Sequence, residues 1–192
     1  MEQYFKSPVT LSGLAVAEPE PPDPNWPRYS LNPFPSYRFI PGQTPHPRRN
    51  PLGHSYHQPE PTSLAFPPEE WQRSEDYLYG IDLYNFAYWW ESHEIFEGLW
   101  HAVGHNTEQG NAFQALIQFA AANLKRFAGN YQAARNLATN GLVRLQKTPA
   151  LYMGIDVARF TEDIQQHRIG SDFRVPLIRL QKQPTSGRTQ RR

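Results

Sequence analysis

The segment between Tyr84 and His101 carries the residue types best suited to chemistry. His93, Glu97 and His101 follow one another at intervals of four residues, and Glu94 lies next to the first of them. On a helix this spacing places nitrogen and carboxylate donors in a row along one side. Such donors hold a divalent metal ion or exchange protons as an acid–base pair. We therefore take His93, Glu94 and Glu97 as candidates for catalysis, and His93, Glu97 and His101 as candidate metal ligands.

The helix expected over residues 88–103 has one broad apolar face. At about 100° per residue, His93 and Glu97 fall on that face, so we expect both side chains to point inward and to need partners. Tryptophan rings beside ionisable groups belong more often to a core, but they also line pockets for small organic ligands. The residues expected to support the site are Asn85, Trp89, Trp90, Trp100, Gln114 and Gln118.

Known catalytic patterns are not completed by these residues. A zincin helix has a second His where this chain has Glu97, and a di-iron bundle has a His three residues after a Glu, which no glutamate of this helix provides. No Gly-x-Ser-x-Gly turn occurs, and Ser92 points about 100° away from His93, so a nucleophilic serine is not supported. No Gly-rich phosphate loop is present. The alternative to a metal is structural: His93 and Glu97 bond each other, and Gln114 or Gln118 completes the network.

Hydrophobic periodicity and capping residues predict an all-α fold, a compact bundle of about five helices over residues 69–172. Ser74 is a suitable N-cap for the first full helix, and Gly104 is a suitable end for the second. The helices are expected at residues 74–85, 88–103, 111–128, 131–146 and 156–167, and an extended segment is expected at residues 175–180.

The first 68 residues differ in composition from the rest. They hold sixteen of the nineteen prolines, which excludes long helices and central strands. Their many aromatic residues are unusual for a disordered segment, so we expect an irregular, polyproline-like arm that packs on the bundle through its rings.

Residues 45–57 of this arm are either a polar surface loop or a cover that lends the site a cation. In the second case we expect Arg48 or Arg49 to grip the carboxylate of Glu94 or Glu97, because a guanidinium stays charged and can form two parallel bonds. The arm candidates for the site are His46, Arg48, Arg49, His54 and His57.

Charge and composition argue against several classes of protein. The formal net charge of +1 gives no general attraction for nucleic acid, although residues 173–192 form a basic tail that we expect to be extended. Without cysteine, the chain forms neither disulfides nor thiolate metal sites. No signal peptide or membrane span is recognisable. We therefore expect a cytoplasmic protein that contacts neither nucleic acid nor a membrane.

A His-x-x-x-Glu-x-x-Trp pattern is formed by His93, Glu97 and Trp100. Residues 82–85 and 88–94 at the start of this pattern, and residues 113–122 after it, are also characteristic. These residues resemble a family of uncharacterised bacterial and archaeal proteins catalogued as domain of unknown function 309, and the resemblance extends over about residues 74–145. The resemblance implies a small all-α bundle of helical hairpins and a proposed metal site at the His and Glu of the pattern. It implies no reaction.

Two positions depart from the pattern of that family. Ala87 stands where the family commonly has Gly, and Ser92 stands where it commonly has Ala. The first departure bears on the break between the first two full helices, since Gly would favour it. The resemblance also implies that residues 37–56 belong to an extension of longer members, so that arm and bundle together would form the site.

Two functions from different classes follow from these residues. The first is a metal-assisted or acid–base site for a small molecule, hydrolase-like, with a divalent metal ion as the candidate cofactor. The second is a non-enzymatic interaction module made of helical hairpins, in which His93 and Glu97 are a structural pair. Its partner would be another protein or a second copy of this chain.

Overall fold

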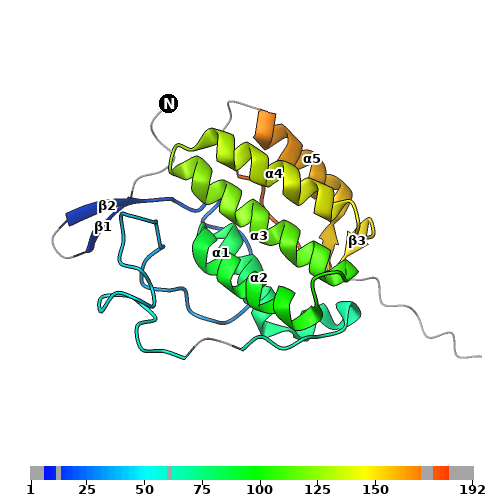
Figure 1. Ribbon diagram of the computed structural model, residues 1–192, viewed down its shortest axis with the longest axis horizontal. Coiled ribbons are helices and arrows are strands. Elements are labelled where there is room, and N and C mark those ends of the chain that lie inside the picture. Colours follow the sequence, from blue (N-terminus) through cyan, green and yellow to red (C-terminus); the bar gives the residue numbers. More distant parts are fainter. Residues whose placement is uncertain (1–6, 12–13, 60–61, 170–174, 182–192) are drawn as a thin grey trace, which may run out of the picture.

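The structure, a computed structural model, describes residues 7–11, 14–59, 62–169 and 175–181. Its helices in these ranges are η1 (Pro68–Arg73), α1 (Glu75–Asn85), α2 (Trp89–Val103), α3 (Glu108–Phe127), α4 (Tyr131–Leu145) and α5 (Val157–Ile169). Each α-helix packs against the next one along the chain, with α1 and α2 on one side of α3 and with α4 and α5 on the other (Figure 1). The predicted all-α bundle is confirmed.

The helix ends follow from local capping. The Ser74 hydroxyl accepts a hydrogen bond from the Tyr77 amide and starts α1, and α2 ends at Gly104, both as predicted. Helix α3 begins three residues before the predicted start, because the Thr107 hydroxyl caps it by accepting from the Gly110 amide at 2.8 Å. The turn before α3 is therefore shorter than the run of polar residues suggests.

The corner between α1 and α2 is made without glycine. Ala87 adopts the left-handed conformation with φ of 65°, and the Tyr88 amide donates to the Leu83 carbonyl at 2.8 Å. Left-handed backbone strains an alanine by about 1–2 kcal/mol. The methyl group of Ala87 is almost fully buried, which offsets part of that strain. The predicted helical hairpin is therefore present although its corner carries Ala.

Glycine allows two pairs of helices to approach closely. A Cβ atom on Gly80 of α1 would lie 2.7 Å from Cε1 of Phe96 on α2, and one on Gly141 of α4 would lie 2.5 Å from Cε1 of Phe119 on α3. Both phenylalanines are buried in the core that the helices enclose. The largest fully buried side chains of the bundle include Tyr77, Tyr84, Phe96, Phe113, Phe119, Ile81, Leu99 and Leu116.

Two short β-hairpins were not predicted. Strands β1 (Ser7–Leu11) and β2 (Leu14–Glu18) pair antiparallel at the start of the proline-rich segment. Strands β3 (Leu151–Tyr152) and β4 (Ile155–Asp156) are joined by Met153 and Gly154, which have positive φ angles of 45° and 80°. Two consecutive residues with positive φ are typical of a type I′ turn. This turn orients the chain into α5.

The segment between β2 and η1 runs along the side of α1 and α2 (Figure 1). Asp82 of α1, which is fully buried, anchors it. Its carboxylate accepts hydrogen bonds from the Arg28 guanidinium at 2.9 Å, from the amides of Tyr29 and Ser30 at 2.8 and 2.9 Å, and from the Ser30 hydroxyl at 2.8 Å. Further along, the Arg38 guanidinium donates to the Phe86 carbonyl at the corner after α1.

The extended segment at residues 175–181 is likewise held by α1. The Asn85 amide donates to the Ile178 carbonyl and accepts from the Ile178 amide, both at 2.8 Å. The Trp26 indole also donates to that carbonyl, and the Tyr29 hydroxyl accepts from the Leu180 amide. Residues 173, 174 and 182–192 of the predicted basic tail lie outside the described residues. The boundaries at residues 68 and 173 stay predictions.

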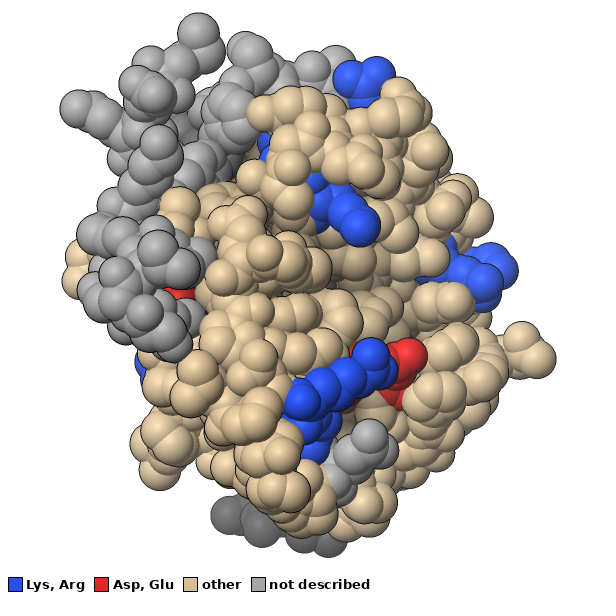
Figure 2. All heavy atoms as spheres, turned by 60° about the vertical axis from the view of Figure 1, so that its left-hand side comes forward, with Lys and Arg blue, Asp and Glu red and all other residues tan. Residues whose placement is uncertain are grey.

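No helix among the described residues is long and apolar enough to cross a bilayer. Figure 2 shows one face of the molecule, on which the charged side chains of the described residues are scattered, and acidic and basic groups lie next to one another in its lower part. Nucleic-acid binding relies on lysines and arginines gathered in one patch. The described part of this face does not carry such a patch.

Glu18 provides a test of how the arm depends on pH. Burial raises the pKa of Glu18 above its usual value of 4.5, and this effect outweighs its contacts with Arg38, which lower the pKa. Because the folded pKa is raised, this group's contribution to stability is complete below pH 4.5 and is lost as the pH rises through the folded pKa. We expect a Glu18→Gln variant to be more stable than wild type at pH 7 and equal to it at pH 4, which urea unfolding at both pH values measures. A variant less stable at pH 7 would show that the Arg38 ion pair outweighs burial.

Candidate functional site

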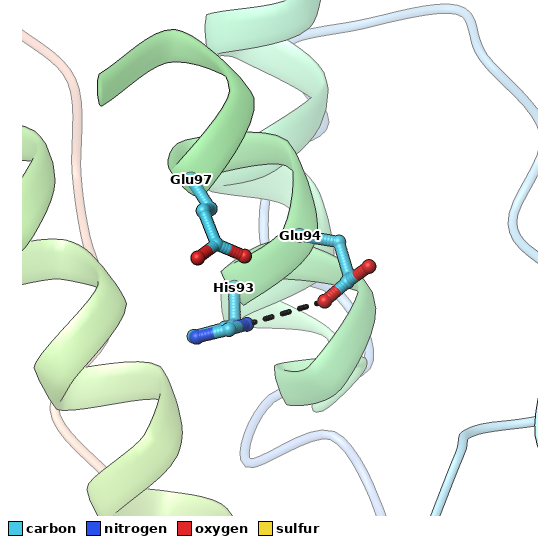
Figure 3. Close-up of side chains that lie close together, drawn as sticks. All are labelled: His93, Glu94 and Glu97. Carbon is cyan, nitrogen blue, oxygen red and sulfur yellow. Dashed lines mark ion pairs between the residues drawn. The ribbon is translucent and has the colours of Figure 1, made fainter. Parts of the chain in front are cut away.

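One turn of α2 brings His93, Glu94 and Glu97 together. One donor atom of each side chain lies within 4.8 Å of the donor atoms of the other two. Figure 3 shows His93 and Glu97 on one side of the helix and Glu94 beside them, with Nδ1 of His93 3.5 Å from Oε1 of Glu94. The helix places Glu97 next to both other residues, because residues three and four positions apart are neighbours on a helix surface. The contact between the adjacent residues His93 and Glu94 depends on their side-chain conformations.

The cluster lies at the edge of the helix interface rather than inside the core. The side chain of His93 is 25% exposed and that of Glu94 is 39% exposed, and Glu97 is also half-buried. His93 and Glu97 are therefore more exposed to solvent than the expected inward orientation implied. Their angular positions border the apolar face of α2 instead of lying at its centre, so water reaches both side chains.

His93 does not form the hydrogen bond to Glu97 that a purely structural role for this pair would require. Its Nδ1 atom is buried and has no hydrogen-bond partner among the described residues, since the 3.5 Å contact with Glu94 is longer than a good hydrogen bond. The predicted bond between His93 and Glu97 is not formed. Gln118 of α3 is half-buried and its Oε1 atom is also without a partner there, and Gln114 is half-buried. The described network thus leaves His93 able to bind a ligand.

The tryptophans surround the cluster at different depths. The ring of Trp90 lies 5.7 Å from the ring of His93, whereas Trp89 is buried and packs against Phe127 of α3. Trp100 stacks at 3.8 Å on the ring of His105. Trp90 is therefore the ring that lies directly against the candidate site.

His101 does not join the cluster. Its Nδ1 atom lies 3.0 Å from Nε2 of His105, and both rings are exposed at the end of α2. The close group of His93, Glu94 and Glu97 excludes His101. A spacing of two helical turns puts His101 too far along the axis, about 12 Å from His93 in rise. Glu94 takes the third position that the spacing had suggested for His101.

The arm does reach α2, but its contact is with Glu91. Nε2 of His54 lies 3.1 Å from Oε1 of Glu91, and the Phe39 amide donates to the same oxygen at 2.9 Å. The ring of His46 packs against Trp90 and Phe39. Both partners of the pair between His54 and Glu91 are nearly buried. Glu91 was missed because it lies about 160° from His93 around the helix, on the side that the arm covers.

The expected arginine contacts are not formed. Nη1 of Arg48 donates to the carbonyls of Gln58 and Pro59, so this guanidinium braces the arm. Arg49 is exposed, and His57 is exposed with a positive φ of 60°. The prediction that Arg48 or Arg49 grips Glu94 or Glu97 was wrong, because the buried carboxylate of this surface is Glu91 and an imidazole meets it.

Asn85, expected to support the site, faces the other way. Its side chain binds the backbone of Ile178, and the adjacent Asp82 binds residues 28–30. Both side chains are fully buried and fully used in joining the arm and the C-terminal segment to α1. The run from Asp82 to Asn85 therefore has a structural role in this chain.

Comparisons with known proteins give one match. Residues 77–137 match the model of a domain of unknown function, DUF309, and this range spans most of α1, all of α2 and α3, and the first part of α4. No curated protein and no solved structure matches the chain. The helices that carry His93, Glu94, Glu97 and Gln118 thus all fall inside the matched range, and over this range the chain resembles the DUF309 family.

Proposed function

We propose that this protein binds one divalent metal ion through His93, Glu94 and Glu97. The observation that carries the proposal is their mutual distance, since the three donor atoms lie within 4.8 Å of one another. Nitrogen and oxygen ligands bound tetrahedrally to one ion at about 2.0–2.2 Å are about 3.3–3.6 Å apart. The 4.8 Å limit exceeds this spacing by about 1.2–1.5 Å, and side-chain rotation of the half-exposed carboxylates can close that gap around an ion.

The chemistry of the donors fits such an ion. One imidazole and two carboxylates suit zinc, manganese or ferrous iron, and the two negative charges balance the charge of the ion. Nδ1 of His93 is buried without a hydrogen-bond partner among the described residues, so its lone pair is available to bind the ion. With three protein ligands the ion would keep open positions for Lewis-acid chemistry. This arrangement supports a hydrolase-like or small-ligand function, with Trp90 as an apolar wall beside His93.

The proposal is tested by measuring metal in protein purified without a polyhistidine tag. We expect one ion per chain on exposure to zinc, manganese or ferrous iron. Loss of a residue that only supports a metal ligand typically weakens metal affinity about 10–100-fold. Replacing a ligand itself, as in His93→Ala or Glu97→Gln, should weaken the affinity by more than this. His101→Ala is the matched control, because it removes an imidazole from the same helix outside the cluster.

Two results would contradict the metal site. If none of these ions binds stoichiometrically, the metal function is lost, and the alternative of an interaction module gains. If His101→Ala weakens binding as much as His93→Ala, the ligand set is His93, Glu97 and His101 instead.

The interaction module has one observation in its favour, since Leu31, Leu52 and Leu64 of the arm are 100%, 61% and 76% exposed. Light scattering would detect self-association through such side chains.

A further inference from the structure

A pocket lies between the arm and the hairpin of α1 and α2. Its volume is about 360 Å³, within the range of small-molecule sites. The arm lines it with His46, Arg48, His54 and Ser55, and α2 lines it with Trp90 and Glu91. The pocket is distinct from the His93 cluster, although Glu94 borders both.

Three side chains of this pocket form a continuous hydrogen-bonded chain. Oγ of Ser55 lies 2.9 Å from Nδ1 of His54, and Nε2 of the same ring lies 3.1 Å from Oε1 of Glu91. One tautomer satisfies both contacts: Nε2 carries the hydrogen and donates to the carboxylate, while Nδ1 accepts from the hydroxyl. A hydroxyl, an imidazole and a carboxylate in this order are the groups of a serine hydrolase triad, with the two ring nitrogens exchanged.

The imidazole of His54 is held firmly in this position. Its ring packs against that of Tyr37 at 4.7 Å, and the Tyr37 hydroxyl accepts from the His54 amide and donates to the Pro45 carbonyl. Glu91 is only 7% exposed and is fixed by the Phe39 amide. Its second oxygen, Oε2, is buried without a hydrogen-bond partner among the described residues. The carboxylate and the imidazole are therefore held against each other by contacts on both sides.

We propose that Ser55 is a nucleophile for acyl transfer from small esters, activated by His54 and Glu91. As Oγ of Ser55 forms a bond to the ester carbonyl carbon, its proton moves to Nδ1 of His54. The alcohol leaves with that proton, and water then hydrolyses the acyl-serine while Nδ1 again takes and returns a proton. Products are the alcohol and the carboxylic acid, and water is the only reactant besides the ester. Glu91 is a positioning residue that keeps the hydrogen on Nε2.

The developing negative charge on the carbonyl oxygen has a candidate partner in the same pocket. Arg48 uses Nη1 to bind the carbonyls of Gln58 and Pro59, which leaves its Nε and Nη2 donors without a bond among the described residues. A guanidinium can stabilise an oxyanion as backbone amides do. The arm thereby supplies the nucleophile, the base and the oxyanion partner, and α2 supplies the orienting carboxylate.

The test is covalent labelling of the full chain with diisopropyl fluorophosphate in the presence of EDTA. In this reaction Oγ displaces fluoride from phosphorus, and its proton passes to the imidazole. We expect one adduct, mapped by peptide mass spectrometry to Ser55, and none in Ser55→Ala. Ser63→Ala is the matched control, since Ser63 is also a half-buried serine of the arm, and it should label like wild type.

Hydrolysis of p-nitrophenyl acetate gives a second measurement. Exposed histidines also cleave this ester, so the rate of Ser55→Ala defines the background. Glu91→Gln keeps an oxygen that can accept from both the Phe39 amide and Nε2 of His54, but it removes the negative charge beside the imidazole that is protonated during the reaction. We expect kcat above that background to fall about 100-fold with KM nearly unchanged. Labelling of other serines at the same rate as Ser55, or equal hydrolysis by wild type and Ser55→Ala, would overturn the proposal. Because EDTA removes divalent metal ions, the result of this test does not depend on whether the His93 cluster binds a metal.

Discussion

Replacing Asp82 by alanine is expected to lower the free energy of unfolding by about 3–5 kcal/mol, the effect of removing one partner of a buried ion pair. The Asp82 carboxylate is fully buried and accepts from Arg28, from two backbone amides and from the Ser30 hydroxyl. After the substitution these donors lose their acceptor, and each buried donor left unpaired costs about 1–3 kcal/mol. The arm can reduce this cost only by leaving α1 and exposing its aromatic rings.

Urea unfolding measures the loss, and limited trypsin digestion shows whether the arm has been released. Arg28 and Arg38 are held against α1 and its corner in the wild type, so cleavage after them should become fast in Asp82→Ala. Asp82→Asn should have a smaller effect because it keeps one acceptor oxygen. Glu75→Gln removes a carboxylate from an exposed position of the same helix and should change stability by less than about 0.5 kcal/mol. If Asp82→Ala were as mild as this control, the arm would not depend on Asp82.

The helices could be predicted from sequence because their signals are local. The hydroxyl of Ser74 caps the amide three residues ahead, and Gly104 ends α2 with a positive φ of 89°. Such features depend on neighbours within one turn, and so does the apolar periodicity of α3. The start of α3 was misplaced only because Thr107, at the end of a polar run, proved to be its cap.

The features that could not be predicted depend on partners far along the chain. Glu91 meets His54, 37 residues away, and Asn85 meets Ile178, 93 residues away. No periodicity or spacing connects such residues. Asn85 was therefore expected to support the site, because its contact with Ile178 could not be foreseen from the sequence. Met153 adopts a left-handed conformation that its residue type does not favour, and the β3–β4 turn therefore gave no signal.

The candidate metal cluster lies between these two cases. The helix places Glu97 one turn from both His93 and Glu94, so its proximity to them follows from spacing. The contact between His93 and Glu94 depends on side-chain conformation, and for that reason spacing favoured His101 over Glu94 as the third ligand. The burial of these side chains depends on how the neighbouring helices pack against α2, which the spacing of residues within α2 does not determine. For that reason the sequence led us to a buried pair, whereas the structure has a half-exposed trio.

Asn85→Leu is expected to cost about 2–4 kcal/mol. Leucine has a similar volume but cannot bind the Ile178 backbone, so the Ile178 amide remains buried without an acceptor, at about 1–3 kcal/mol. The Ile178 carbonyl keeps the Trp26 indole as a donor and loses only one of its two hydrogen bonds, at about 0.5–1.5 kcal/mol. Ile178 is 1% exposed, and water does not replace the lost bonds unless the segment at residues 175–181 detaches. Urea unfolding measures the cost, and hydrogen exchange at the Ile178 amide, now without its 2.8 Å acceptor, should become faster than in wild type.

Asn85→Asp separates loss of shape from loss of the donor. An ionised Asp at this position would still accept from the Ile178 amide, but its other oxygen would face the Ile178 carbonyl without a proton. A protonated Asp restores that donor, so folding favours the neutral form and raises the pKa of the new group. The variant should therefore be close to wild type in stability at pH 4 and lose stability as the pH rises toward 7. Asn140→Asp, at an exposed position of α4, should show no such difference from wild type. A pH-independent effect of Asn85→Asp would mean that its donor contact with the Ile178 carbonyl contributes nothing to stability.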